Sequence, residues 1–387
     1  MAVMTTIPIP NGIAKIVSRT ELLNCDAWQR AFHGKCKDNR YYEIVDETLE
    51  GNFEHRYLSI EDRSGTVRAV QPVFFVRQNL VEGVPGRIRS VVDFVREKFP
   101  RFLTMRVLMV GCAAGAADLG TCDEKDETWV AAALLASLRN YARQSRASLV
   151  VLKDFLAKYR SVLEPYRSKG YVRMPSMPMT RLALRYRDWD EYFSTLSKAT
   201  RKDLRRKFRK AERARKIEME VTSDIAPYVD EIYPLYLQVH ERSSLKFETL
   251  TKDYFRAVGQ RMPERARFFI WRQSGKIVGF SFCLVCGDTI YDECIGLDYN
   301  VALDLHLYFY TLRDIISWSI QQGLKYYYSN PLNYGPKLHL RCELVPLDLY
   351  VMHTSALLNP IFRRIIKYLG PARHDPFLRK FPNAHEL

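Results

Sequence analysis

Two adjacent carboxylates lie in the middle of a mostly apolar segment. Asp292 and Glu293 interrupt the stretch 289–297, which otherwise reads as a strand. Neighbouring strand residues point to opposite faces, so one of the two carboxylates must face a helix layer or a cleft. Burial there would raise its pKa toward the range that a general base needs. The alternative for each residue is an ion pair with one of the many arginines.

A predicted helix follows this strand after the loop 298–304. Backbone amides at a helix start have no partner inside the helix and can bind phosphate oxygens. Here the candidate amides are those of Leu305, His306, Leu307 and Tyr308. The alternative is an ordinary strand-to-helix turn. The ring of His306 is a weak signal by itself, because packing also explains such histidines.

A third carboxylate lies near the end of the predicted helix 225–242. Glu241 precedes Arg242, which would favour its charged form, and this makes it a further candidate base. The alternative is a structural role at a surface helix end.

The elements that must position these groups have the same order in both halves of the chain. Each half reads as a hairpin, a strand, a loop, a long helix and a strand, which is an α/β arrangement. In the first half these elements are 55–60, 66–76, 106–110, 127–146 and 147–152. In the second half they are 266–272, 277–285, 289–297, 305–322 and 324–329. A length of 387 residues fits two such units.

A strongly basic helix is predicted between the halves, over 188–216. Asp188 and Glu191 have the spacing of a capping box, and one narrow apolar stripe includes Phe208. Residues 198–216 contain eleven Lys or Arg and two acidic residues, a net +9 of the chain's +15. We therefore divide the chain into 1–187, the connecting helix 188–216, and 217–387.

Three stretches resemble the GNAT superfamily, in its tandem branch of CelD-like and Fem-like acyltransferases. They are 196–212, similar to the basic inter-unit helix, 275–299, similar to the central β-meander, and 334–347, similar to the closing Tyr/Lys segment. The resemblance implies two GNAT-like units, each a mixed twisted sheet flanked by helices. It also implies N-acyl transfer from acetyl-CoA, another acyl-CoA or acyl carrier protein to a small or lipid-linked amine.

The resemblance also implies roles for residues that spacing alone does not single out. Tyr334 and Lys337 would bind the acceptor or protonate the leaving thiolate, and Asn300 would contact the substrate. For Lys337 the alternative is a solvated loop position. The segment 300–306 departs from the family's phosphate-binding loop because it contains no glycine. No cysteine has a recognisable Cys/His nucleophile setting, so we expect direct attack without a metal or covalent intermediate.

The basic helix has three interpretations: a solvated face, a docking surface for acyl carrier protein or anionic lipid, or a grip on tRNA. Nucleic-acid sites interleave aromatic residues with cations, and only Phe208 lies within the run, on the buried stripe. This disfavours tRNA. The alternative functions are a Fem-like aminoacyl-tRNA-dependent transferase on a cell-wall precursor and a non-catalytic module that kept the fold.

The remaining features concern the compartment. Eight scattered cysteines favour reduced thiols, and we find no targeting signal or membrane span, so we expect a soluble cytoplasmic protein. The segment 357–369 places apolar residues on one face and fits either core docking or peripheral contact with the inner membrane face. The small-residue loop 111–120 lacks a following Lys-Ser/Thr, which excludes a nucleotide P-loop and leaves a second donor loop or a flexible loop. Nothing indicates the oligomeric state.

Overall fold

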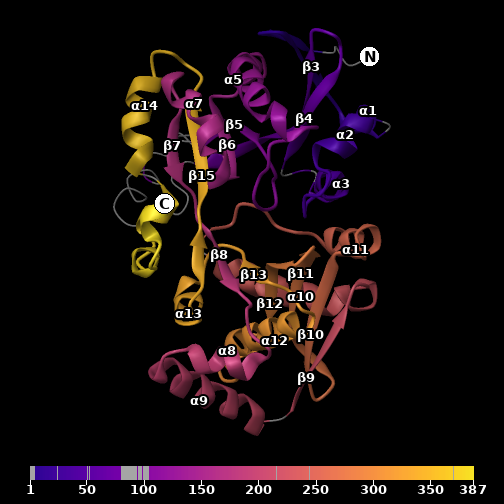
Figure 1. Cartoon of the computed structure of the whole chain (residues 1–387), viewed down its shortest axis with the longest axis vertical. Helices are drawn as coiled ribbons and strands as arrows, with labels where there is room; N and C mark the ends of the chain where they lie inside the picture. The colour runs from indigo at the N-terminus through magenta and orange to yellow at the C-terminus, as the bar shows by residue number, and fades with distance from the viewer. Residues whose placement is uncertain are drawn as a thin grey trace. The chain divides into compact units, whose positions relative to one another are not determined.

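The computed structural model describes residues 5–23, 25–49, 51, 53–79, 94, 98, 104–214, 216–243, 245–368 and 370–387. The chain forms two compact units. Unit 1 comprises Met1–Met177, Pro346–Asp375 and Leu387, and unit 2 comprises Pro178–Val345 and Pro376–Glu386. Each unit is a mixed sheet with flanking helices, as Figure 1 shows, which confirms the predicted α/β class.

Unit 1 is built on an eight-stranded sheet. In spatial order its strands are β1 (Thr6–Ile9), β2 (Gly12–Val17), β3 (Glu54–Asp62), β4 (Val67–Asn79), β5 (Thr104–Val110), β6 (Leu149–Leu156), β15 (Leu347–His353) and β7 (Val172–Pro175). All neighbours are antiparallel except β5 and β6, which are joined by α5 (Glu127–Gln144). The predicted hairpin, strand, helix and strand of the first half are confirmed.

Unit 2 is built on a seven-stranded sheet with the same central pattern. In spatial order its strands are β14 (Glu343–Val345), β8 (Met179–Ala183), β13 (Tyr326–Ser329), β12 (Thr289–Leu297), β11 (Lys276–Cys286), β10 (Ala266–Gln273) and β9 (Ile217–Thr222). Its parallel pair is β12 and β13, and α12 (Leu307–Gln321) connects them. The predicted order of the second half is likewise confirmed.

The other helices cover these sheets. In unit 1 they are α1 (Arg19–Leu22), α2 (Asp26–Ala31), α3 (Asn39–Thr48), α6 (Arg160–Leu163), α7 (Pro165–Ser168) and α14 (Asn359–Ile365). In unit 2 they are α8 (Trp189–Thr195), α9 (Lys198–Ala214), α10 (Val229–Arg242), α11 (Lys252–Arg261) and α13 (Tyr334–His339). Within the described ranges, no helix combines the length and the apolar character needed to cross a bilayer.

The two units exchange one strand each, which corrects the predicted boundaries. Strand β15 comes late in the sequence but lies between β6 and β7, whereas β8 comes early but lies between β13 and β14. The chain therefore passes between units at 177/178 and 345/346 rather than near 187 and 217. Both crossings carry a proline, which has no N–H for a strand ladder.

The predicted connecting helix 188–216 is two helices of unit 2, not a separate linker. The first helix, α8, has the predicted cap: the Asp188 carboxylate accepts from the amide of Glu191 at 2.8 Å. It ends at Thr195 because Ser197 caps a second helix, accepting from the Thr200 amide at 3.1 Å. The buried residues of α9 pack in one hydrophobic core with residues of α8 and α12, and its basic faces point outward.

The small-residue loop Gly111–Gly120 of unit 1 is packed in the protein. Its amides include that of Gly120, which donates to Gln71 Oε1 at 3.0 Å, and that of Ala117, which donates to the carbonyl of Asp154 at 2.9 Å. Most of its residues are buried. The interpretation as a plain flexible loop is therefore wrong, and its service as a second donor loop stays a prediction.

One glycine allows α10 to lie directly against β12. A Cβ at Gly296 would be 2.2 Å from Cε1 of Phe280 and 2.6 Å from the backbone nitrogen of Tyr236 on α10. We expect Gly296→Ala to lower the free energy of unfolding by about 1–3 kcal/mol, because helix and sheet must separate. Urea denaturation measures this change.

The matched control is Gly279→Ala in the neighbouring strand β11. There the added Cβ would lie 3.2 Å from the flexible tip of Leu297. A smaller loss of stability is expected, and equal losses for the two variants would contradict the proposed helix–sheet contact.

Candidate functional site

Strands β12 and β13 pair over four residues and then diverge. Thr289–Asp292 pair with Tyr326–Ser329, after which β13 ends while β12 continues along β11 to Leu297. The register of β11 and β12 shifts between Phe282 and Cys283, which leaves Glu293 as an extra residue in β12. Such bulges bend a strand and often lie beside active sites. The structure thus places both predicted mid-strand carboxylates where the two strands diverge.

Asp292 is buried in a polar cluster at this point. Its side chain accepts from Ser281 Oγ at 2.6 Å and from the Tyr327 hydroxyl at 2.7 Å. Burial raises the pKa of Asp292 above its ordinary value, although the two hydrogen bonds and the nearby Lys337 oppose the rise. A buried carboxylate with a raised pKa suits a general base.

Lys337, on α13, is only 2% exposed. Its ammonium donates to the carbonyls of Asn330 and Leu332 and so fixes the chain that leaves β13. Burial lowers the pKa of Lys337 to about 8, against the attraction of Asp292. The alternative of a solvated loop lysine is therefore wrong.

The side chain of Tyr308 joins this cluster from the first turn of α12. Its hydroxyl is hydrogen-bonded to Asn333, and burial together with the negative charge of Asp292 raises its pKa. The hydroxyl is therefore a weaker acid than that of a free tyrosine and stays protonated at neutral pH, which leaves it a hydrogen-bond donor. Sequence analysis considered only the backbone amide of this residue.

Glu293 is half-buried and is held by the residue that follows β13. The side-chain amide of Asn330 donates to the Glu293 carbonyl at 2.8 Å and to its carboxylate at 2.9 Å. Asn330 also donates its backbone N–H to the Asp292 carbonyl at 3.1 Å. This asparagine spans the divergence, and sequence reasoning missed it because it has no distinctive spacing.

The start of α12 does not present the predicted row of open amides. Three of the four are donated to backbone carbonyls: Leu305 to Val301 at 3.0 Å, His306 to Leu303 at 3.3 Å, and Leu307 to Ala302 at 3.0 Å. His306 caps the helix in the left-handed conformation, with φ of 50°. Consequently, these amides do not fit the diphosphate of coenzyme A as a helix-end cradle.

The remaining predicted residues lie around this centre in different settings. Tyr334 is 1% exposed and its hydroxyl donates to the Pro178 carbonyl at 2.7 Å, so it supports α13 rather than opening to solvent. Glu241 is exposed in the last turn of α10. Asn300 is exposed and donates to Asp298 Oδ1 at 2.8 Å. The structure thus brings Asp292, Lys337 and Tyr308 together. It does not bring the other three predicted residues into this cluster.

The outward face of α9 carries a stripe of four cations at helical spacing. These are Lys202, Arg205, Arg209 and Arg213, all exposed. None of the four has an ion pair with any residue for which the structure is described. We call this set the α9 cation stripe. Lys207 and Lys210, beside it, lie near His306 and contribute to lowering its pKa, of which burial is the larger cause.

A surface pocket of about 520 Å³ lies between α8, α9 and α12. Two cations of the stripe, Arg205 and Arg209, line it together with the aromatic rings of Trp189, Phe193 and Phe208. The Arg205 guanidinium lies 5.2 Å from the centre of the Phe193 ring. The fold therefore places aromatic rings beside the cations, an arrangement that the sequence of α9 alone does not contain.

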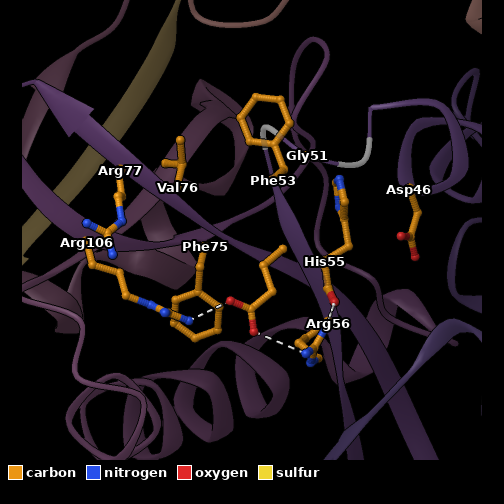
Figure 2. Close-up of a pocket in the computed structure, with 10 residues that line it drawn as sticks. Asp46, Gly51, Phe53, His55, Arg56, Phe75, Val76, Arg77 and Arg106 are labelled. Atoms are coloured by element: carbon orange, nitrogen blue, oxygen red, sulfur yellow. Dashed lines mark hydrogen bonds and ion pairs between the residues drawn. The ribbon is translucent and has the colours of Figure 1, made fainter.

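Unit 1 has a pocket of about 470 Å³ beside the start of β3 and the end of β4. Three arginines, Arg56, Arg77 and Arg106, line it, and Figure 2 shows Arg106 beside the ring of Phe75, 4.4 Å from its centre. Arg106 and Arg56 pair with Glu54 at 2.6 and 3.1 Å. The pocket contains none of the predicted site residues.

Comparisons with known proteins agree with this architecture. Residues 198–334 match the model of the Acetyltransferase (GNAT) domain. No curated protein sequence matches the chain. The structure of FemX is similar with a TM-score of 0.52 and 12% identity, over 94% of this chain and 100% of that one.

Two further solved structures are similar at lower scores. L-PGS from Bacillus licheniformis has a TM-score of 0.49 and 13% identity, over 85% of this chain and 95% of its own. A tandem GNAT protein from the clavulanic acid biosynthesis pathway has a TM-score of 0.49 and 11% identity, over 88% and 99%.

The two parallel-paired sheets, the divergence at Asp292 and the matched domain define an acyltransferase fold. The chain carries an acetyltransferase (GNAT) domain over residues 198–334, within unit 2, and both of its units are GNAT-like mixed sheets of one plan. The likeness to FemX, at 12% identity, shows a shared fold.

Proposed function

We propose that unit 2 transfers an acyl group from a thioester to an amine by direct attack. The observation that carries this proposal is the divergence of β12 and β13 beside a buried carboxylate of raised pKa, Asp292. A thioester arm would enter between the two strands. Its carbonyl carbon would then lie close to Asp292 and Tyr308.

The proposed steps balance without a metal or an enzyme-bound intermediate. Asp292 takes a proton from the attacking ammonium, and the freed nitrogen forms a bond to the thioester carbon. As the tetrahedral intermediate collapses and the C–S bond breaks, the second proton of the nitrogen passes to the Tyr308 hydroxyl while that hydroxyl gives its own proton to the leaving sulfur. Tyr308 therefore ends neutral, and the products are an amide and a free thiol. Lys337 donates to the carbonyls of Asn330 and Leu332 and so fixes the chain that leaves β13 after Ser329.

We favour acyl carrier protein over free acyl-CoA as the source of the thioester. The α12 start offers few open amides for the diphosphate of coenzyme A, whereas the α9 cation stripe suits a large acidic carrier. The eight free cysteines fit a reducing compartment, so we place the reaction in the cytoplasm, at or near the inner face of the membrane. The acceptor is a small or lipid-linked amine.

A second candidate is Fem-like transfer from an aminoacyl-tRNA to the amine of a cell-wall precursor. The pocket lined by Arg205, Arg209, Trp189 and Phe193 favours it, because unpaired bases stack on aromatic rings beside cations. Of its aromatic residues only Trp189 is half-exposed, and Asp190, Glu212 and Asp314 also line the pocket. The pocket therefore weakens, and does not remove, the argument against RNA from the aromatic content of the basic run. The bond broken would then be an ester.

A donor assay distinguishes the candidates. The purified chain is incubated with an acyl-CoA, an acyl carrier protein thioester or aminoacyl-tRNA, together with a panel of soluble and lipid-linked amines. Mass spectrometry then detects the amide product. Amide from acyl carrier protein at higher kcat/KM than from acyl-CoA supports the proposal. Amide from aminoacyl-tRNA alone would overturn it in favour of the second candidate, and no amide from either thioester would also count against it.

A further inference from the structure

The end of unit 1 exposes apolar side chains at high density. Ten large hydrophobic side chains are exposed in the described part of the chain, and five of them fall within 357–368. They are Leu357, Leu358, Ile361, Ile365 and Tyr368, each between 53% and 86% exposed. Contiguous apolar exposure of this kind marks an interaction surface more often than isolated exposed residues do.

These side chains are not the ones that attach α14 to unit 1. The ring of Phe362 lies 5.8 Å from that of His353 on β15, and Ile366 is 8% exposed. The side chain of Asn359 accepts from the His353 amide at 3.0 Å and donates to the Gly170 carbonyl at 3.0 Å. The helix is thus fixed along one side, and the five exposed side chains form a second apolar face.

The residues that carry this second face are basic and not acidic. Residues 355–374 contain four basic residues and no Asp or Glu. Arg363 and Arg364 are exposed and make no ion pair within the parts of the chain that are described. The Arg373 guanidinium lies 5.0 Å from the centre of the exposed Tyr368 ring.

We propose that the five exposed apolar side chains, with Arg363, Arg364 and Arg373, form a docking surface for an anionic lipid membrane, here called the α14 surface. An amphipathic basic helix with an exposed apolar face and a flanking tyrosine inserts into the headgroup region and meets anionic headgroups with its arginines. We favour a lipid membrane over an acidic protein as the partner because four of the five exposed apolar side chains are aliphatic. The proposal does not depend on which donor or acceptor the transferase uses.

The test is co-sedimentation of the full chain with vesicles of phosphatidylcholine, with and without phosphatidylglycerol, at low and high salt. Wild type is expected to bind the vesicles containing phosphatidylglycerol at least tenfold more tightly than pure phosphatidylcholine. A variant with Leu357→Gln, Leu358→Gln, Ile361→Gln and Ile365→Gln is expected to lose binding to both. Arg363→Gln with Arg364→Gln should reduce the preference for phosphatidylglycerol.

A control variant tests whether vesicle binding depends on the α14 surface itself. Leu23→Gln with Met219→Gln changes exposed apolar residues elsewhere and is expected to bind like wild type. Unchanged binding of the Leu357–Ile365 variant, or no binding by wild type at low salt, would overturn the proposal. The alternative partner is a second copy of the chain, which analytical ultracentrifugation would detect. If wild type is a dimer that binds no vesicles, and the Leu357–Ile365 variant is a monomer, the α14 surface is a dimer interface instead.

Discussion

Asp292→Asn is expected to lower kcat/KM for amide formation by roughly 10²–10⁴-fold, the usual contribution of a positioned general base. The amide side chain has nearly the same shape but cannot accept a proton at neutral pH. Because Ser281 and Tyr327 both donate to this side chain, the variant can also lose stability. Thermal unfolding is therefore measured beside the kinetics, and the activity is compared at a temperature where both proteins are folded.

The control is Asp288→Asn, the same exchange in the turn before β12, where the carboxylate pairs with Lys325 at 3.1 Å. It is expected to leave kcat within about threefold of wild type, as a surface ion pair contributes little. Equal effects of the two exchanges would contradict a catalytic role for Asp292.

The pH profile gives a second readout of the same residue. Attack requires the Asp292 carboxylate, so the rate rises as pH increases through its pKa, which burial holds above the ordinary value. Tyr327→Phe removes a hydrogen bond that stabilises the carboxylate, so the pKa rises further and the acid limb moves to higher pH. An acid limb that does not move would exclude Asp292 as the titrating base.

Neutralising the α9 cation stripe is expected to give the second large effect. The variant carries Lys202→Gln, Arg205→Gln, Arg209→Gln and Arg213→Gln. If each of the four cations contributes about 1 kcal/mol near an anionic surface, KM for a carrier-bound donor rises by up to roughly a thousandfold at low salt. KM for a free acyl-CoA changes far less, because a small donor covers little of a stripe that follows the length of the helix.

A matched variant removes four exposed cations of unit 2 that lie outside α9. It carries Arg187→Gln, Lys216→Gln, Lys246→Gln and Lys325→Gln. We expect a much smaller change in KM for the carrier-bound donor. If both variants weaken the donor equally, net charge rather than the stripe is responsible. If the stripe variant binds tRNA more weakly, and its affinity for tRNA depends less steeply on salt concentration, the result supports the Fem-like candidate.

The local apolar pattern of the sequence was sufficient to predict the strands and the helix of unit 2 that surround Asp292. Apolar periodicity predicted the order β10, β11, β12, α12 and β13. The interruption of β12 by Asp292 and Glu293 marked these carboxylates as candidate bases before any of their hydrogen-bond partners was known. These features are local, because the spacing of apolar residues within an element shows whether one or both of its faces are buried.

Other parts of the site required the tertiary structure because they depend on residues far apart in the chain. Ser281 and Tyr327, eleven residues before and thirty-five after Asp292, decide how its charge is stabilised. Lys337 gains a pKa of about 8 only through burial in this fold. The amides of Leu305 and Leu307 appeared open in sequence but are used by the preceding turn.

The sequence by itself determined two α/β units of one plan, a basic helix and a carboxylate pair in a central strand. The tertiary structure alone decided that β8 and β15 exchange units, that aromatic rings of α8 adjoin the cations of α9, and that α14 leaves Ile361 and Ile365 exposed while Phe362 packs inward. The physical reason is that the periodicity of apolar residues indicates how much of an element is buried. The partner against which it is buried is set by competition among all apolar faces of the chain.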